Sequence, residues 1–86
     1  MPKLVATHEV DDVAHWLASP MREQAFAGIA KNITTYVLPG GSNRVALSMD
    51  VADMAAFDAI MKSDVAAKAM QHDGVRPETL VMYIAS

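Results

Sequence analysis

Histidines are the side chains best suited to proton transfer in this 86-residue chain, which has three of them and no cysteine. An imidazole changes its charge near neutral pH, so it can act as a general acid or base. His8 is the strongest candidate, because it lies in the apolar run LVATHEV. Strand alternation would place it on a face with Leu4, Ala6 and Val10. The sequence therefore predicts either an acid–base residue at His8 or a buried structural imidazole bonded to a backbone carbonyl or a helix side chain.

The other two histidines have structural explanations. His72 lies in the run QHDG, where a helix is expected to end, so it can cap that terminus and interact with the helix dipole. His15 precedes Trp16 and points away from the expected apolar stripe, which predicts a surface position. The histidine spacing fits no metal motif and no two histidines share a helix face, so no metal site is predicted.

Four further residues are candidates for contacting a ligand. Trp16, the only tryptophan, could form the wall of a pocket or be an ordinary core aromatic. Tyr36 and Tyr83 lie in expected strands, where their hydroxyls could bond a ligand or their rings could pack in a dimer interface, depending on the strand register. Met49 belongs to a group of methionines that could fill the core or make a pocket adaptable.

These candidates need elements to position them, and hydrophobic periodicity predicts an alternating order. Strands are expected over 3–10, 32–38, 44–50 and 78–85, with a turn over 39–43. The first helix should start after Asp11–Asp12, break at Ser19–Pro20 and stop near Gly28. The second should be capped by Asp53, re-capped at Ser63–Asp64 and ended by Asp73–Gly74.

The predicted order is βαββαβ, the ferredoxin-like arrangement, in the α+β class. It implies a four-stranded antiparallel sheet with both helices on one face. The other face is normally polar, but Leu80, Met82 and Ile84 alternate with Val81, Tyr83 and Ala85, so the last strand is apolar on both sides. We therefore expect the second face to be covered by another copy, as a homodimer.

The composition restricts the classes of protein to which the chain can belong. At 52% hydrophobic and 20% charged, residues 1–86 are expected to form a single folded domain. The net charge is −3 and the basic residues are scattered, which argues against nucleic-acid and anionic membrane partners. There is no apolar run long enough for a signal peptide or a membrane span, so a cytoplasmic protein is expected.

Two runs resemble the dimeric α+β barrel superfamily. THEVDDVAHW is similar to the junction of strand and helix in small members, where a histidine precedes an acidic helix start and a tryptophan. SNRVALSMDVADMAAFDAIMKSDVAAKAMQHDGV is similar to their second half. Relatives in this superfamily include antibiotic biosynthesis monooxygenases, polyketide cyclases and stress-responsive barrel proteins. The resemblance implies a homodimer with a pocket between the sheet and the helices of each chain.

The resemblance leaves three functional hypotheses. The first is a cofactor-independent cyclase, isomerase or monooxygenase that acts on a hydrophobic or aromatic molecule with His8 as acid or base. It adds His72, because some cyclase relatives use a histidine near the second helix. The second is a non-catalytic ligand-binding or stress-associated protein, and the third is a pure assembly module. Haem-degrading relatives would carry an asparagine in the first strand, where this chain has Thr7 and His8, so no haem or other cofactor is expected.

Overall fold

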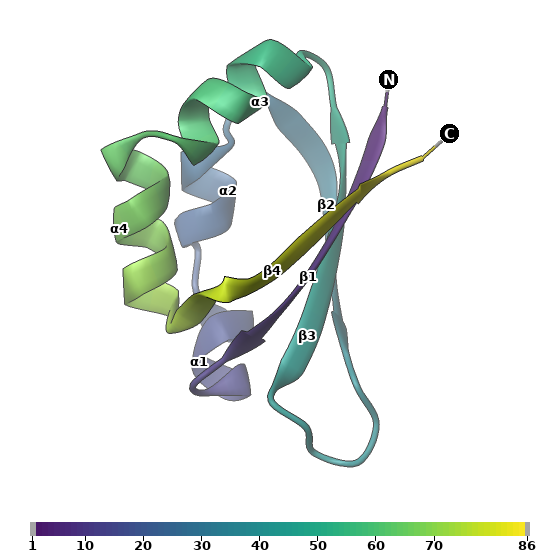
Figure 1. Ribbon diagram of the computed structural model, residues 1–86, viewed down its shortest axis with the longest axis vertical. Helices are drawn as coiled ribbons and strands as arrows, with labels where there is room; N and C mark the ends of the chain where they lie inside the picture. The colour runs from purple at the N-terminus through teal and green to yellow at the C-terminus, as the bar shows by residue number, and fades with distance from the viewer. Residues whose placement is uncertain (1, 86) are drawn as a thin grey trace.

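Four strands and four helices follow one another in the computed structural model, which describes residues 2–85 (Figure 1). In chain order they are β1 (Lys3–Val10), α1 (Val13–Ala18), α2 (Met21–Ala25), β2 (Ala30–Val37), β3 (Arg44–Val51), α3 (Met54–Met61), α4 (Asp64–Asp73) and β4 (Val75–Ile84). The sheet order is β2-β3-β1-β4, and each neighbouring pair is antiparallel. This confirms the ferredoxin-like α+β fold.

Each predicted helix is a pair of short helices. Three of the four short helices begin at polar caps that were expected from the sequence. Asp12 accepts a hydrogen bond from the N–H of His15, and Asp53 accepts from those of Ala55 and Ala56. Ser63 caps α4 in the same way. Each cap satisfies backbone N–H groups that have no partner within the first helical turn. At the other end of α4, Gly74 adopts a left-handed φ of 72°, which glycine tolerates without steric cost.

All four helices lie on one side of the sheet, and the opposite face is bare in Figure 1. Strand alternation explains the division, because alternate residues of β1 and β3 are buried beneath the helices. The core consists of Leu4, Ala6, Val10, Trp16, Phe26, Val45, Leu47, Met49, Val51 and Phe57. Within it, the rings of Phe26 and Phe57 stack with centroids 5.2 Å apart, which joins the end of α2 to α3.

Two strands begin earlier than the sequence predicted. The strand expected over 32–38 is β2, Ala30–Val37, and its register shifts between Lys31 and Thr34. Asn32 lies at this irregularity with φ 55°, a conformation that asparagine tolerates. The strand expected over 78–85 is β4, Val75–Ile84. Pro77 does not interrupt it, because β4 is an edge strand and can accept a proline at an irregular position.

The irregularity in β4 lies opposite His8. Thr7 pairs with Val81 and Glu9 pairs with Arg76, so several residues of β4 bulge out across from His8. A hydrogen bond to the Thr79 hydroxyl, 2.9 Å long, satisfies the Glu9 N–H in place of a ladder bond. Such bulges commonly occur beside functional sites, where they redirect a side chain.

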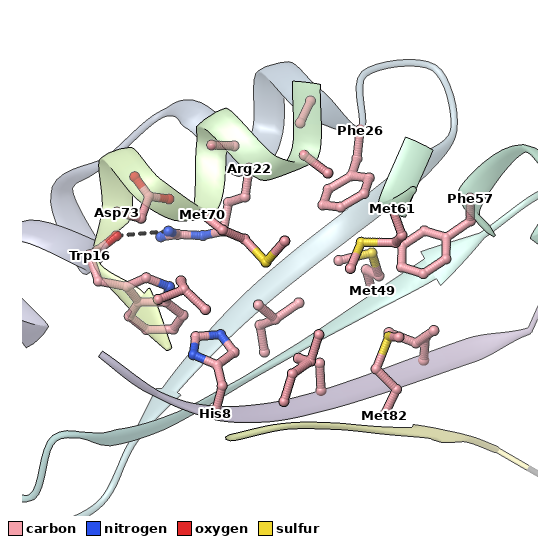
Figure 2. Close-up of a pocket in the computed structure, with 18 residues that line it drawn as sticks. His8, Trp16, Arg22, Phe26, Met49, Phe57, Met61, Met70, Asp73 and Met82 are labelled. Carbon is pink, nitrogen blue, oxygen red and sulfur yellow. Dashed lines mark hydrogen bonds between the residues drawn. The ribbon is translucent and has the colours of Figure 1, made fainter. Parts of the chain in front are cut away.

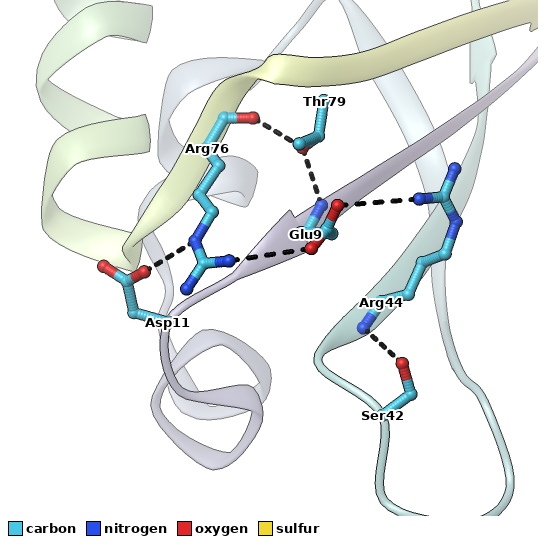
Figure 3. A network of polar contacts seen from close by, with 6 residues as sticks. All are labelled: Glu9, Asp11, Ser42, Arg44, Arg76 and Thr79. Carbon is cyan, nitrogen blue, oxygen red and sulfur yellow. Dashed lines mark hydrogen bonds and ion pairs between the residues drawn. The ribbon is translucent and has the colours of Figure 1, made fainter.

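Ion pairs connect the bulged segment of β4 to β1 and β3 (Figure 3). The Arg76 guanidinium lies 3.0 Å from Asp11 Oδ1 and 3.6 Å from Glu9 Oε1. Arg44 approaches the other oxygen of Glu9 at 3.8 Å, so this carboxylate links β3, β1 and β4. These side chains are 31–68% exposed, so each pair stabilises the fold by less than about 1 kcal/mol.

The helices are all short. Within residues 2–85, none is long and apolar enough to cross a membrane.

Candidate functional site

A cavity lies between the sheet and the helices (Figure 2). Its floor includes His8 from β1 and Met82 from β4, and its roof includes Arg22, Met70 and Asp73. The volume is about 70 Å³. One water needs about 10–15 Å³ on a comparable measure, so the space suits about five waters or one small ring. Typical pockets for drug-sized ligands are larger, about 300–1,000 Å³.

His8 is the only residue in the described chain with a buried side-chain N or O atom that lacks a hydrogen-bond partner. That atom is Nδ1, and the whole residue is 3% exposed. The imidazole meets the Trp16 indole edge to face, with centroids 5.6 Å apart. A buried, unpaired polar atom costs about 1–3 kcal/mol, so it needs a physical explanation. A hydrogen bond from a ligand in the cavity would remove that cost.

The surroundings of His8 favour its neutral form. Burial is the main cause that lowers the pKa of His8 below the ordinary value of 6.5, and the positive charge of Arg22 adds to it. The backbone of Glu9 and the carboxylate of Asp73 act in the opposite direction and raise the pKa. At neutral pH the imidazole is therefore uncharged, with one nitrogen able to accept a proton. In this state His8 can begin a reaction as a base.

The lowered pKa predicts that acid weakens the fold. Between the folded-state pKa and the ordinary value of 6.5, the unfolded chain binds a proton at His8 that the folded chain does not. The free energy of unfolding should therefore fall as the pH drops below about 6.5, and be independent of this group above it. Urea denaturation across this range should show the loss in wild type and a smaller one in His8→Met. An equal loss in both proteins would contradict the prediction.

Trp16 and Arg22 form one end of the cavity together. Trp16 is buried on α1, and the guanidinium carbon of Arg22 lies 4.6 Å from the centroid of its ring. Arg22 Nη1 donates to the Trp16 carbonyl at 2.7 Å, and Nη2 donates to that of Leu17 at 3.3 Å. The arginine thus caps the end of α1 and stacks on the indole, which fixes the position of the ring beside His8.

Asp73 is a buried acid at the rim of this cavity, and neither it nor Arg22 was predicted from the sequence. It is the last residue of α4, and its Oδ1 lies 2.9 Å from His72 Nδ1. The sequence did carry a signal, because a carboxylate at a helix C-terminus opposes the macrodipole. Such a local conflict is often found at functional sites. For Arg22 there was no comparable signal, since its contacts with Trp16 and Leu17 arise only from the way the chain turns between α1 and α2.

The structure brings together three of the residues proposed from sequence and separates the rest. His8, Trp16 and Met49 line the same cavity, with Met61, Met70 and Met82. Tyr36 and Tyr83 do not line it. Val5 pairs with both Ser48 and Tyr83, and the Tyr36 hydroxyl lies 3.1 Å from that of Ser48, so both tyrosines project from the bare face of the sheet. The strand register turns them away from this cavity, and of the two roles considered from sequence this position favours packing in a dimer interface.

The remaining histidines lie side by side outside the cavity. His72 is exposed near the end of α4, and His15 is exposed on α1 as predicted. Their ring centroids are 5.1 Å apart, and His15 Nε2 lies 2.8 Å from the His72 carbonyl oxygen. With Asp73 they form a group of three side chains that could hold a metal ion. His15 is 57 residues from His72 in the chain, so sequence spacing could not reveal this group.

Comparison with known proteins supports the fold. No protein-family model matches the chain, and no curated protein sequence matches it significantly. Among solved structures, a protein described as an antibiotic biosynthesis monooxygenase is 12% identical, with a TM-score of 0.65, over 100% of this chain and 97% of that one. A conserved protein from Methanosarcina mazei is 12% identical, with a TM-score of 0.69, over 98% and 89%.

An ethyl tert-butyl ether D (EthD) family protein from Bacillus halodurans is 15% identical, with a TM-score of 0.62, over 100% of this chain and 97% of that one. These likenesses span nearly the whole chain and confirm the predicted resemblance at the level of fold. At such low identity they do not carry over an activity, so the function has to be argued from the cavity.

Proposed function

We propose that this chain is a small cytoplasmic, homodimeric barrel protein that binds a hydrophobic, single-ring aromatic molecule between its sheet and helices. Within that cavity His8 acts as the acid or base of a cofactor-independent reaction, namely an isomerisation, cyclisation or oxygenation. The observation that supports this most is the buried His8 imidazole, whose Nδ1 has no partner, in a cavity that is lined mostly by apolar side chains, with Arg22 and Asp73 at one end. Polar groups of this kind orient a ligand in a pocket whose other walls are apolar.

The size and lining of the cavity restrict which ligands can bind. A volume of about 70 Å³ suits one ring, and a polycyclic molecule would have to displace side chains. The movable walls are methionines, whose unbranched side chains adapt at low cost. A neutral His8 calls for a hydroxyl or carbonyl group on the ligand, because such a group can pair with the imidazole. The ligand class we propose is therefore a phenol or a small aromatic ketone.

The dimer is proposed from the bare face of the sheet. Tyr36, Val81 and Tyr83 each expose 42–59% of their surface there, although tyrosine and valine usually bury more. The structurally similar antibiotic biosynthesis monooxygenase supports an oxygenation among the reactions considered. The alternative is a ligand carrier with the same cavity and no turnover, since the cavity is small and His8 has no direct hydrogen bond to a second catalytic group among the described residues.

Proton exchange separates the enzyme from the carrier. Acetophenone has exchangeable α-protons and a carbonyl group that can face His8. In deuterium oxide, the imidazole would take an α-proton, leaving an enolate, and return a deuteron to the carbon after exchange with solvent. We expect exchange by the protein to exceed buffer alone by about 10²-fold or more, and to be lost in His8→Ala.

His15→Gln is the control, because it removes an exposed histidine outside the cavity and should leave the exchange unchanged. If wild type binds acetophenone but gives only the buffer rate, the carrier hypothesis replaces the catalytic one. If acetophenone and smaller aromatic molecules do not bind at all, both hypotheses are wrong.

A further inference from the structure

Three metal-binding side chains converge outside the cavity, where α1 meets the end of α4. His15 comes from α1, and His72 and Asp73 come from α4. Their ligand atoms all lie within 4.8 Å of one another. Figure 1 shows the two helices approaching at this corner of the molecule, and the hydrogen bond between His15 and the His72 carbonyl joins them. The fold therefore brings these groups together without a metal.

The surroundings of the Asp73 carboxylate favour the binding of a cation. Its side chain is only 5% exposed, and it ends α4, where the helix dipole disfavours an anion. Within residues 2–85, no lysine or arginine forms an ion pair with it, and His72 is its one ion-pair partner. A buried carboxylate is costly without a cation. A divalent cation bound by Asp73 together with the two histidines would supply one.

We propose that His15, His72 and Asp73 bind a divalent first-row transition-metal ion of the Zn²⁺ type, with water completing the coordination. Imidazole and carboxylate ligands suit Zn²⁺, whereas Mg²⁺ and Ca²⁺ prefer all-oxygen sites. Metal–ligand bonds of about 2.0–2.2 Å put tetrahedral ligands about 3.4 Å apart. His72 Nδ1 and Asp73 Oδ1 already lie 2.9 Å apart. To reach the metal, the two exposed imidazoles would exchange their present hydrogen bonds, from His15 to the His72 carbonyl and from His72 to Asp73, for bonds to the ion. Because Asp73 also lines the cavity, the ion would lie just behind its wall.

The test uses full-length protein without a histidine tag, stripped of metal with a chelator and titrated with Zn²⁺ in a calorimeter. We expect one Zn²⁺ per chain, and visible absorption when Co²⁺ is used instead. His15→Gln and Asp73→Asn should each weaken Zn²⁺ binding at least about tenfold.

Two controls make the result specific to this cluster. Asp58→Asn removes an exposed carboxylate on α3, and His8→Ala removes the only other histidine; both should bind Zn²⁺ as wild type does. His15 is exposed, so His15→Gln remains informative even if the buried Asp73→Asn does not fold. The proposal is overturned if folded wild type shows no saturable Zn²⁺ binding, or if His15→Gln binds as tightly as wild type.

Discussion

Replacing Val81 by aspartate is expected to turn the protein from a dimer into a monomer. Val81 is on the bare face of β4 and is 42% exposed in the single chain. In the proposed dimer this face is covered by its counterpart, so each interface would bury two unpaired carboxylates. Burying an unpaired charge costs several kcal/mol. We expect the dimer to weaken at least a hundredfold, which light scattering at micromolar concentration will show as a halved mass.

Val65→Asp is the matched control. Val65 is 52% exposed, similar to Val81, but it lies on α4, away from the sheet. The same change there should leave the mass of the dimer unaltered. Circular dichroism should show both variants folded, since aspartate costs a strand position at most about 1 kcal/mol. A monomeric wild type at micromolar concentration would contradict the proposed dimer, as would a Val81→Asp protein of unchanged mass.

Replacing Trp16 by alanine should cause the largest loss of stability of any single truncation. The residue is 1% exposed, and it contacts both the His8 ring and the Arg22 guanidinium. Removing a buried tryptophan side chain costs about 3–5 kcal/mol. A domain of this size is stable by only about 5–15 kcal/mol, so much of its stability would be lost.

Urea denaturation measures this effect, with both proteins at one concentration because dimerisation adds to the apparent stability. Leu17→Ala is the neighbouring control. Leu17 is on the same helix but 43% exposed, and its truncation should cost well below about 2 kcal/mol. Equal losses in the two variants would show that Trp16 does not anchor the helices to the sheet as its burial implies.

The sequence was sufficient to predict the fold wherever the local signals agree with one another. Alternation in β1 predicted its bounds and the buried face that carries His8, and the caps Asp12, Asp53 and Ser63 predicted where helices begin. The early starts of β2 and β4 were not predicted. Both strands are irregular there, with a left-handed Asn32 and a proline in an edge strand. Local rules treat such residues as breaks, whereas the neighbouring strands hold them in the sheet.

The site was predictable only in part, for a related reason. His8, Trp16 and Met49 share a cavity because each faces the core from its own element, and periodicity reports this. The faces of Tyr36 and Tyr83 depend on strand register, which periodicity does not determine when both faces are apolar. Arg22 and Asp73 reach the cavity through the packing of α2 against α4, a tertiary arrangement that spacing along the chain does not encode.

The central claim is that the His8 imidazole is the polar contact for a ligand in the cavity, and paired titrations test it most directly. Phenol and toluene are similar in size, but only phenol has a hydroxyl, which can pair with His8 in either tautomer. Their binding can be followed by the fluorescence of Trp16, the only tryptophan. Satisfying a buried polar atom is worth about 1–3 kcal/mol, and about 1.4 kcal/mol is tenfold in affinity.

We therefore predict that wild type binds phenol about tenfold more tightly than toluene, and that His8→Ala binds toluene but loses this preference. Equal binding of the two molecules by wild type would contradict the claim. So would a preference for phenol that survives in His8→Ala.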